Sequence, residues 1–284
     1  MVRSRLAFTA GALLAALLSL VPRAARAQQT SPQTEPQAAA PEADTARPPP
    51  PSALDTAPRP WLYTPDPSGP LPGQVLASLG AGYAQIDRGA ARPFAGNVAQ
   101  GGAVFGASGE VGVLRVLSIQ AEGLLAGDGS SVNGGAVLGA VVHPFPARWP
   151  VTLAVGGGYL RELGGDQGAW GRVTFASDLG PVRLMAGVLG SHLFAPGRDG
   201  LDWLLSTGAS YRLGSIVRLG VEYVVQDLEE AGDSDEVDGG VRHFLGPSVG
   251  LTLARRVQLT AGPAFGLSRG APPFQGRMAA IYAF

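Results

Sequence analysis

From Gln74 to the C-terminus, apolar residues alternate with small or polar residues in one segment after another. The segment 216–226 shows this most clearly, with Val217, Leu219, Val221, Tyr223 and Val225 set against Arg218, Gly220, Glu222 and Gln226. A period of two residues is typical of β-strands, whose side chains point to opposite faces in turn, and it does not fit an amphipathic helix. This part of the chain is therefore predicted to be all-β.

Twelve such segments can be counted, each about 10–13 residues long, with the alternation typical of half-buried or barrel strands. They span residues 74–86, 100–113, 117–127, 134–143, 150–161, 169–179, 182–194, 201–213, 216–228, 241–253, 256–268 and 274–284. Their connections alternate between short turns, such as Gly180-Pro181 and Gly214-Ser215, and mostly longer, more polar loops, such as 87–99 and 229–240. Short turns on one side and longer loops on the other are typical of an antiparallel, up-and-down transmembrane β-barrel.

The aromatic residues support the same layout. Ten of them are expected near the rim with the longer loops: Tyr83, Tyr159, Phe194, Tyr223, Phe265, Phe105, Trp170, Trp203, Phe244 and Phe274. Trp149, Tyr211, Tyr282 and Phe284 are expected near the opposite rim. Two aromatic girdles flanking an apolar band indicate a membrane-spanning barrel, whereas a soluble β-sandwich does not predict this placement.

Composition excludes several other classes. Only 15% of residues are charged, against about 25% in an average soluble domain. All 21 basic residues are Arg, 22 acids bring the formal net charge to -1, and Cys is absent. A basic nucleic-acid surface, a disulfide framework and a Cys-ligated metal site are therefore not expected.

The N-terminus resembles an export signal. Arg3 and Arg5 precede an apolar run from Leu6 to Val21, and Ala25-Arg26-Ala27 supplies small residues for cleavage after Ala27. The run is shorter than the ~20 residues of a spanning helix, although an uncleaved anchor helix is the alternative. Residues 28–72 then carry 13 of the 24 Pro and little aliphatic patterning. They are predicted to form a disordered periplasmic tether, with a binding arm as the alternative.

The chain ends in Met278-Ala-Ala-Ile-Tyr-Ala-Phe284, with Met278, Ala280 and Tyr282 at alternate positions before the terminal Phe. This ending resembles the last strand of Gram-negative outer-membrane β-barrel proteins. The resemblance implies a barrel in the outer membrane, in contact with its lipid and lipopolysaccharide, and insertion by the barrel assembly machinery, with Tyr282 and Phe284 as the assembly signal. It identifies no specific family.

Two prolines conflict with this pattern. Pro247 and Pro263 lie within strands, where each removes a hydrogen-bond donor from the ladder, and the turn near Arg255 places them opposite each other. A bulge or kink is expected there. A ten-stranded barrel is the alternative if this hairpin folds inward as a loop.

If the large apolar residues face lipid, the other face of each strand lines the lumen. The lumen-facing candidates are Glu110, Glu122, Arg172, Arg183, Arg212, Arg218, Glu222 and Arg277, among many Gly, Ala and Ser. Charges of both signs either pair and plug the barrel or form a constriction that filters polar solutes. Twelve strands lie between eight-stranded barrels, which side chains fill, and 16-stranded porins, which hold an open channel.

One predicted external loop is strongly acidic, with Glu229, Glu230, Asp233, Asp235, Glu236 and Asp238. Oxygen ligands suit Ca²⁺ or Mg²⁺, but the spacing does not match an EF-hand, so a solvated loop is favoured and no metal or cofactor is expected. Ser191 and His192 are neighbours on one strand and point to opposite faces, so they do not form a hydrolytic pair. An enzyme is not predicted.

Two functional hypotheses remain. The first is a narrow passive channel for small polar solutes. The second is a closed structural or adhesion barrel whose Pro-rich tether contacts peptidoglycan or a periplasmic partner.

Overall fold

A computed structural model describes residues 66–84, 102–127, 132–145, 149, 151–195, 202–226, 241–254, 256–268 and 271–284. The predicted signal peptide 1–27, the predicted tether up to residue 65 and the acidic loop lie outside these residues. No helix in the described part is long and apolar enough to cross a membrane.

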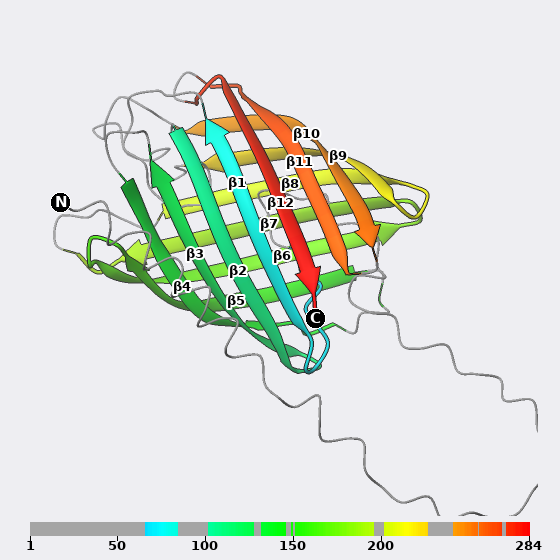
Figure 1. Ribbon diagram of the computed structural model, residues 1–284, viewed down its shortest axis with the longest axis horizontal. Coiled ribbons are helices and arrows are strands. Elements are labelled where there is room, and N and C mark those ends of the chain that lie inside the picture. The colour runs from blue at the N-terminus through cyan, green and yellow to red at the C-terminus, as the bar shows by residue number, and fades with distance from the viewer. Residues whose placement is uncertain are drawn as a thin grey trace, which may run out of the picture. The chain divides into compact units, whose positions relative to one another are not determined.

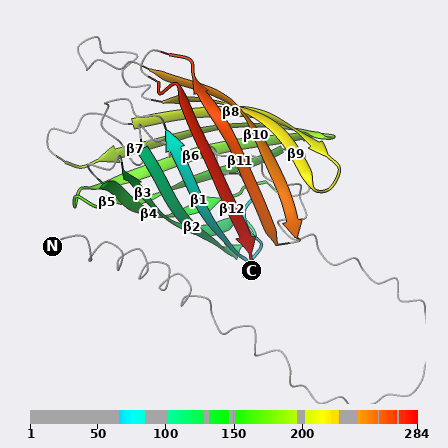
Figure 2. The same cartoon turned by 45° about the horizontal axis from the view of Figure 1, so that its top comes forward.

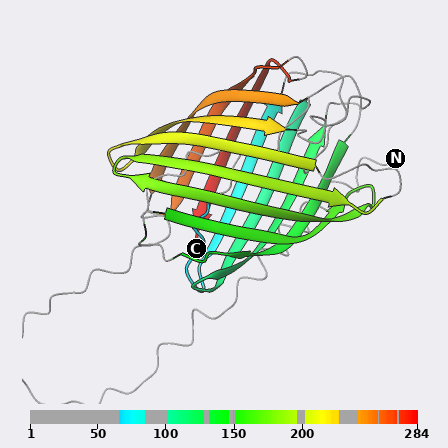
Figure 3. The same cartoon turned by 180° about the vertical axis from the view of Figure 1, so that it is seen from behind.

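The described chain forms a single closed barrel of twelve strands (Figure 1). The strands are β1 (Val75–Ala84), β2 (Gly102–Leu114), β3 (Leu117–Gly127), β4 (Val132–Val142), β5 (Val151–Glu162), β6 (Gln167–Leu179), β7 (Val182–Leu193), β8 (Asp202–Leu213), β9 (Val217–Gln226), β10 (Arg242–Ala254), β11 (Val257–Gly266) and β12 (Phe274–Ala283). Each strand pairs antiparallel with the next, and the view from behind shows β5 to β8 completing the wall (Figure 3). The predicted all-β, up-and-down, twelve-stranded barrel is confirmed, and the ten-stranded alternative is wrong.

The first and last strands close the barrel. β1 and β12 run side by side (Figure 2), and nine residues of each are in register, from Leu76 opposite Ala283 to Ala84 opposite Gln275. The backbone N–H of Phe284 donates to the carbonyl oxygen of Val75 across 2.9 Å. Closure leaves no unpaired strand edge, the condition for a sheet to exist in lipid.

The two ends of the barrel differ. The turn end carries the start of β1, the end of β12 and the short connections, and the loop end carries the other connections. In the short turns, Gly180 and Gly214 have φ of 62° and 70°, a left-handed conformation that glycine adopts without a Cβ clash. These turn residues let consecutive strands reverse within a few residues.

The alternation seen in the sequence determines which side of the wall each residue occupies. Leu79, Tyr83, Phe105, Ile119, Leu138, Leu219 and Met278 are among the many large apolar side chains exposed on the outside. Buried apolar residues instead cluster inside the barrel, with Leu204, Val224, Phe244, Ala264 and Ala271 in one group and Ala84, Val104, Leu124 and Ala126 in another. The outer apolar surface suits a lipid solvent rather than water.

Two aromatic residues do not lie where the girdle prediction placed them. Trp170 and Phe244 are 7% and 1% exposed, because their positions in the ladders share the inner face with Gly158 and Val224. Tyr83, Phe105, Tyr159, Phe194, Trp203, Phe265 and Phe274 are exposed on the outside, as are Trp149, Tyr211, Tyr282 and Phe284. The two girdles are therefore formed by the other aromatic residues. Trp170 and Phe244 face the lumen, although their large apolar rings suggested the outer face.

The bulge expected at the two prolines does not form, but the β10–β11 ladder is interrupted there, because residues 246–248 and 262–264 are not paired with each other. Pro247 and Pro263 lie opposite each other, but Leu245 pairs with Phe265 before them and Val249 with Ala261 after them in an unchanged register. The register shift in this hairpin lies between Thr252 and Ala254, near the turn. Both strands keep their other partners, Pro247 facing Val221 on β9 and Pro263 facing Gly276 on β12, so the wall stays continuous.

Candidate functional site: the lumen and its turn-end mouth

The strand registers place all eight predicted lumen residues at inward positions. Arg172, Arg183, Arg218 and Glu222 are buried within the barrel, while Glu110, Glu122 and Arg277 are half-buried. Arg212 is exposed, because it lies near the end of β8 beside Arg218 at the turn end. The lumen thus carries guanidinium and carboxylate groups along its length. The outward-facing side chains of the same strands are mainly apolar.

At the turn end, Arg183 joins β7 to the segment that precedes β1. Its Nη2 atom lies 3.2 Å from Oδ1 of Asp66 and 3.3 Å from Oγ of Ser68, and its Nη1 atom donates to Oδ2 of Asp178 across 2.5 Å. The side chains of Asp66 and Arg183 are 6% and 8% exposed. An ion pair this deeply buried holds its partners in place, because separating them leaves an uncompensated charge.

His143, just after β4, makes a second attachment to the same segment. Its Nδ1 donates to the carbonyl oxygen of Pro67 across 2.8 Å, since a carbonyl only accepts. Its Nε2 lies 3.0 Å from Oγ of Ser118 and 3.4 Å from Oε1 of Glu110, and Ser118 donates to that carboxylate across 2.6 Å. A buried network therefore ties β2, β3 and β4 to the backbone of Pro67.

The other end of the segment lies against β2. Pro72 bridges to Gly112, and the N–H of Gly73 donates to the carbonyl oxygen of Gly112 across 2.8 Å. The approach is so close that a Cβ on Gly112 would overlap the carbonyl oxygen of Leu71. A side chain at this position is incompatible with the docked segment.

These contacts show that residues 66–72 cross the mouth of the barrel. Gly112 is on β2 and Arg183 on β7, five strand-to-strand steps apart in a ring of twelve and thus nearly opposite. Seven residues reach up to about 23–25 Å when extended, enough for such a crossing. We call residues 66–72 the crossing segment.

The prediction of a disordered tether over residues 28–72 does not hold for the crossing segment, which is bonded to the barrel at Arg183 and His143. Nothing in the sequence distinguishes Asp66 from Asp44 or Asp55, which lie in the same Pro-rich stretch. Its role depends on Arg183, 117 positions further along the chain, and His143, 76 positions beyond Pro67. Only the closed barrel brings these residues together.

The middle of the lumen is polar, and its polar side chains are buried. Arg172 stacks on Trp170, with its Cζ atom 5.8 Å from the ring centroid. Trp170 Nε1, Thr174 Oγ1 and Gln120 Oε1 are buried without a hydrogen-bond partner among the described residues. Buried polar groups that have no protein partner are normally satisfied by ordered water, so these atoms mark places for individual bound water molecules between the packed side chains.

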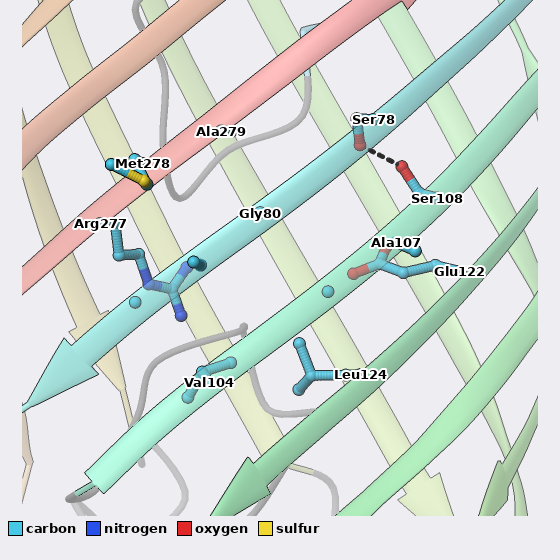
Figure 4. Close-up of a pocket in the computed structure, with 13 residues that line it drawn as sticks. Ser78, Gly80, Val104, Ala107, Ser108, Glu122, Leu124, Arg277, Met278 and Ala279 are labelled. Carbon is cyan, nitrogen blue, oxygen red and sulfur yellow. Dashed lines mark hydrogen bonds between the residues drawn. The ribbon is translucent and has the colours of Figure 1, made fainter. Parts of the chain in front are cut away.

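A cavity of about 140 Å³ opens on the inner wall formed by β12, β1, β2 and β3 (Figure 4). Glu122 and Arg277 approach it from opposite sides, with glycine-containing stretches of β1 and β2 between them. Toward the loop end the lumen is more apolar, with Phe244 packed against Leu204 and Val224. Within the described ranges, no cluster of three or more histidine or acidic side chains is arranged to hold a metal ion.

The C-terminal residues lie as the sequence pattern indicates. Met278, Tyr282 and Phe284 are exposed on the outside of β12, and the rings of Tyr282 and Phe284 are in edge contact with centroids 4.6 Å apart. Glu229, Glu230, Asp233, Asp235, Glu236 and Asp238 lie outside the described residues, so the acidic loop stays a prediction.

Comparison with solved structures finds the same architecture in outer-membrane proteins. The KdgM porin matches with a TM-score of 0.51 at 7% identity, covering 74% of this chain and 99% of the porin. An outer-membrane channel from Pseudomonas putida F1 matches with a TM-score of 0.51 at 10% identity, covering 76% of this chain and 96% of the channel.

This chain has the fold of outer-membrane β-barrel channels. A second KdgM structure, in complex with disordered oligogalacturonate, matches with a TM-score of 0.50 at 8% identity, covering 74% of this chain and 99% of the porin. No family model and no curated protein matches the sequence. Because the identities are so low, the likeness establishes the fold alone.

Proposed function

We propose that this protein is an outer-membrane channel through which small polar solutes diffuse passively. The observation that carries the proposal is the polar interior of a closed barrel whose outside is apolar. Arg172, Thr174 and Gln120 place polar side chains on the inner face of the wall, as in outer-membrane barrels, whose interior is polar. A polar lumen of this kind offers polar solutes a path across the bilayer.

The fold supports this proposal at a coarser level. The solved structures with this architecture include a porin and an outer-membrane channel. The lumen here holds both acidic residues and arginines, among them Glu110, Glu122, Glu222, Arg172 and Arg277. Mixed charge favours small polar solutes over a purely anionic chain such as the oligogalacturonate bound by the KdgM porin.

Orientation and route follow from the same proposal. The turn end faces the periplasm and the loop end the exterior, as short and long connections do in bacterial barrels. Export depends on the signal peptide 1–27, and insertion depends on the barrel assembly machinery. The outer surface of the barrel contacts membrane lipid and lipopolysaccharide. Peptidoglycan is the proposed partner of the Pro-rich tether on the periplasmic side.

Conductance in planar bilayers tests the channel directly. The purified full-length mature protein should give discrete current steps above those of protein-free bilayers. A preparation that is folded, shown by its heat-dependent mobility shift on electrophoresis, and yet gives no steps would overturn the proposal. Cell fractionation tests the location, since recovery as soluble periplasmic protein would contradict it.

A further inference from the structure

The cavity on the β12–β1–β2–β3 wall exists because glycines in β1 and β2 place no side chains in it. A Cβ built on Gly80 would meet only the carbonyl oxygen of Met278, at 3.6 Å, and one on Gly106 would come no closer than 3.4 Å to Leu124 Cδ1. Neither glycine has a positive φ. By contrast, a Cβ on Gly158 or Gly246 would overlap the backbone of the neighbouring strand. At positions 80 and 106, therefore, glycine is required neither by the backbone nor by packing, and its effect is free volume.

Opposite charges flank this free volume. Arg277 comes from β12 and Glu122 from β3, three strand steps away, and their head groups point toward one another across β1 and β2 (Figure 4). The Arg277 side chain runs over Gly82, whose built Cβ would lie 3.1 Å from its Cγ. A larger residue at position 82 would push the guanidinium out of this position.

Polar and apolar groups complete the lining. The hydroxyls of Ser78 and Ser108 are hydrogen-bonded to each other across 2.6 Å at one side of the cavity. Val104 and Leu124 supply apolar surface on the other side. A solute lying here would thus meet a carboxylate at one end, a guanidinium at the other, and mixed surface between them.

We propose that this cavity is a binding station for small zwitterionic solutes of amino-acid size on their way through the channel. The solute carboxylate lies at Arg277 and its ammonium group at Glu122. The inference rests on the proposed channel function and adds its solute class. The guanidinium is suited to a carboxylate because its planar donors match the two oxygens, and a carboxylate accepts the hydrogens of an ammonium group.

The volume agrees with a small solute. A cavity of about 140 Å³ is close to the ~150 Å³ that accommodates a benzene-sized molecule, which has six heavy atoms. Alanine also has six heavy atoms. Because the site opens to the lumen of the proposed channel, its charges are screened and binding is weak, and weak binding lets a solute leave the station and complete its passage.

The test compares two isomers that differ in charge separation. Alanine and lactamide have the same atoms, but only alanine is a zwitterion at pH 7. Proteoliposomes containing the full-length mature protein are mixed with each solute, and the swelling rate is followed by light scattering. Alanine should enter about fivefold faster than lactamide, the ratio provided by one partly solvated charge interaction.

Variants then assign the preference to the cavity. Arg277→Gln and Glu122→Gln should each bring the alanine-to-lactamide ratio close to one. Gly80→Val should lower the same ratio by filling the cavity, without removing a charge. Gly171→Val is the matched control, since Gly171 is on the outer face of β6 and a Cβ there meets nothing closer than 3.8 Å. Its ratio should equal that of the wild type.

The outcomes separate this inference from the proposed function. Equal rates for the two isomers in the wild type, or a ratio that Arg277→Gln, Glu122→Gln and Gly80→Val all leave unchanged, would overturn the binding station and leave the channel standing. Entry of neither solute, from protein shown to be folded, would overturn the channel itself.

Discussion

The Oδ1 atom of Asp66 lies 3.2 Å from Nη2 of Arg183, in a buried ion pair that joins the chain before β1 to the far side of the barrel. Together with the contact between Pro67 and His143, this pair holds the crossing segment in the turn-end mouth. The mouth is thus partitioned by the protein's own chain. Any solute that uses the lumen passes beside residues 66–72 or waits for them to move.

Asp66→Ala should raise channel conductance. The substitution removes the ion pair, while Arg183 keeps Asp178 as a partner, so the loss acts on docking of the segment more than on the barrel. Losing a charged hydrogen bond of this kind costs about 1.5–3 kcal/mol, which increases the undocked population by at least tenfold. Single-channel recording in planar bilayers measures the result. Asp166→Ala, at the loop end between β5 and β6, is the control and should conduct as the wild type does.

Gly112→Val should expel the crossing segment by steric overlap. Its Cβ would collide with the carbonyl oxygen of Leu71, which belongs to the segment's backbone and has no side-chain freedom to move aside. Limited proteolysis followed by mass spectrometry should find that the wild-type protected fragment begins at or before Asp66. The variant fragment should begin near Gln74. Gly171→Val provides the control for a new side chain on a strand, and identical fragments from all three proteins would contradict the docking.

Phe244→Ala should destabilise the folded barrel by about 3–5 kcal/mol, the usual cost of emptying a site that held a buried Phe. Phe244 is 1% exposed and packs against Leu204 and Val224 inside the lumen. Phe175→Ala, on the outer face, should cost less than half as much, because its ring is 40% exposed. Urea unfolding in detergent micelles, followed by tryptophan fluorescence, makes the comparison. An equal loss of unfolding free energy in the two variants would contradict the burial of Phe244 inside the lumen.

Phe284→Ala should lower the amount of assembled protein severalfold while leaving the barrel that does form nearly unchanged. The ring is half exposed on the outer surface, where it contacts the ring of Tyr282, so it contributes little to the interior. The backbone hydrogen bond from Phe284 to Val75 does not need the side chain. Quantifying the heat-modifiable form in outer-membrane fractions tests this. If the variant assembled in the same amount as the wild type, the side chain of Phe284 would not be an assembly signal.

The sequence by itself determines the strands and their sides. A period of two residues assigns inner and outer faces locally, so twelve strands and the inward positions of residues such as Arg172 and Glu222 follow without knowledge of any long-range contact. The alternation of turns and loops then implies antiparallel neighbours, because short connections can join only adjacent strands. The resemblance of the last strand to outer-membrane barrels points the same way.

The tertiary structure decided what meets inside the barrel. Strand tilt and register determine that Asp66 reaches Arg183 and that Glu122 and Arg277 face one cavity, and neither property is encoded in the period of a single strand. Trp170 and Phe244 obey the same alternation but point inward, because ladder position rather than residue type selects the face. Likewise, Pro247 and Pro263 keep the register since each strand retains its partner on the other side. The alternation within each strand therefore specifies the strands and the face of each residue. Only closure of the barrel determines which side chains meet in the lumen, because those side chains come from strands far apart in the sequence.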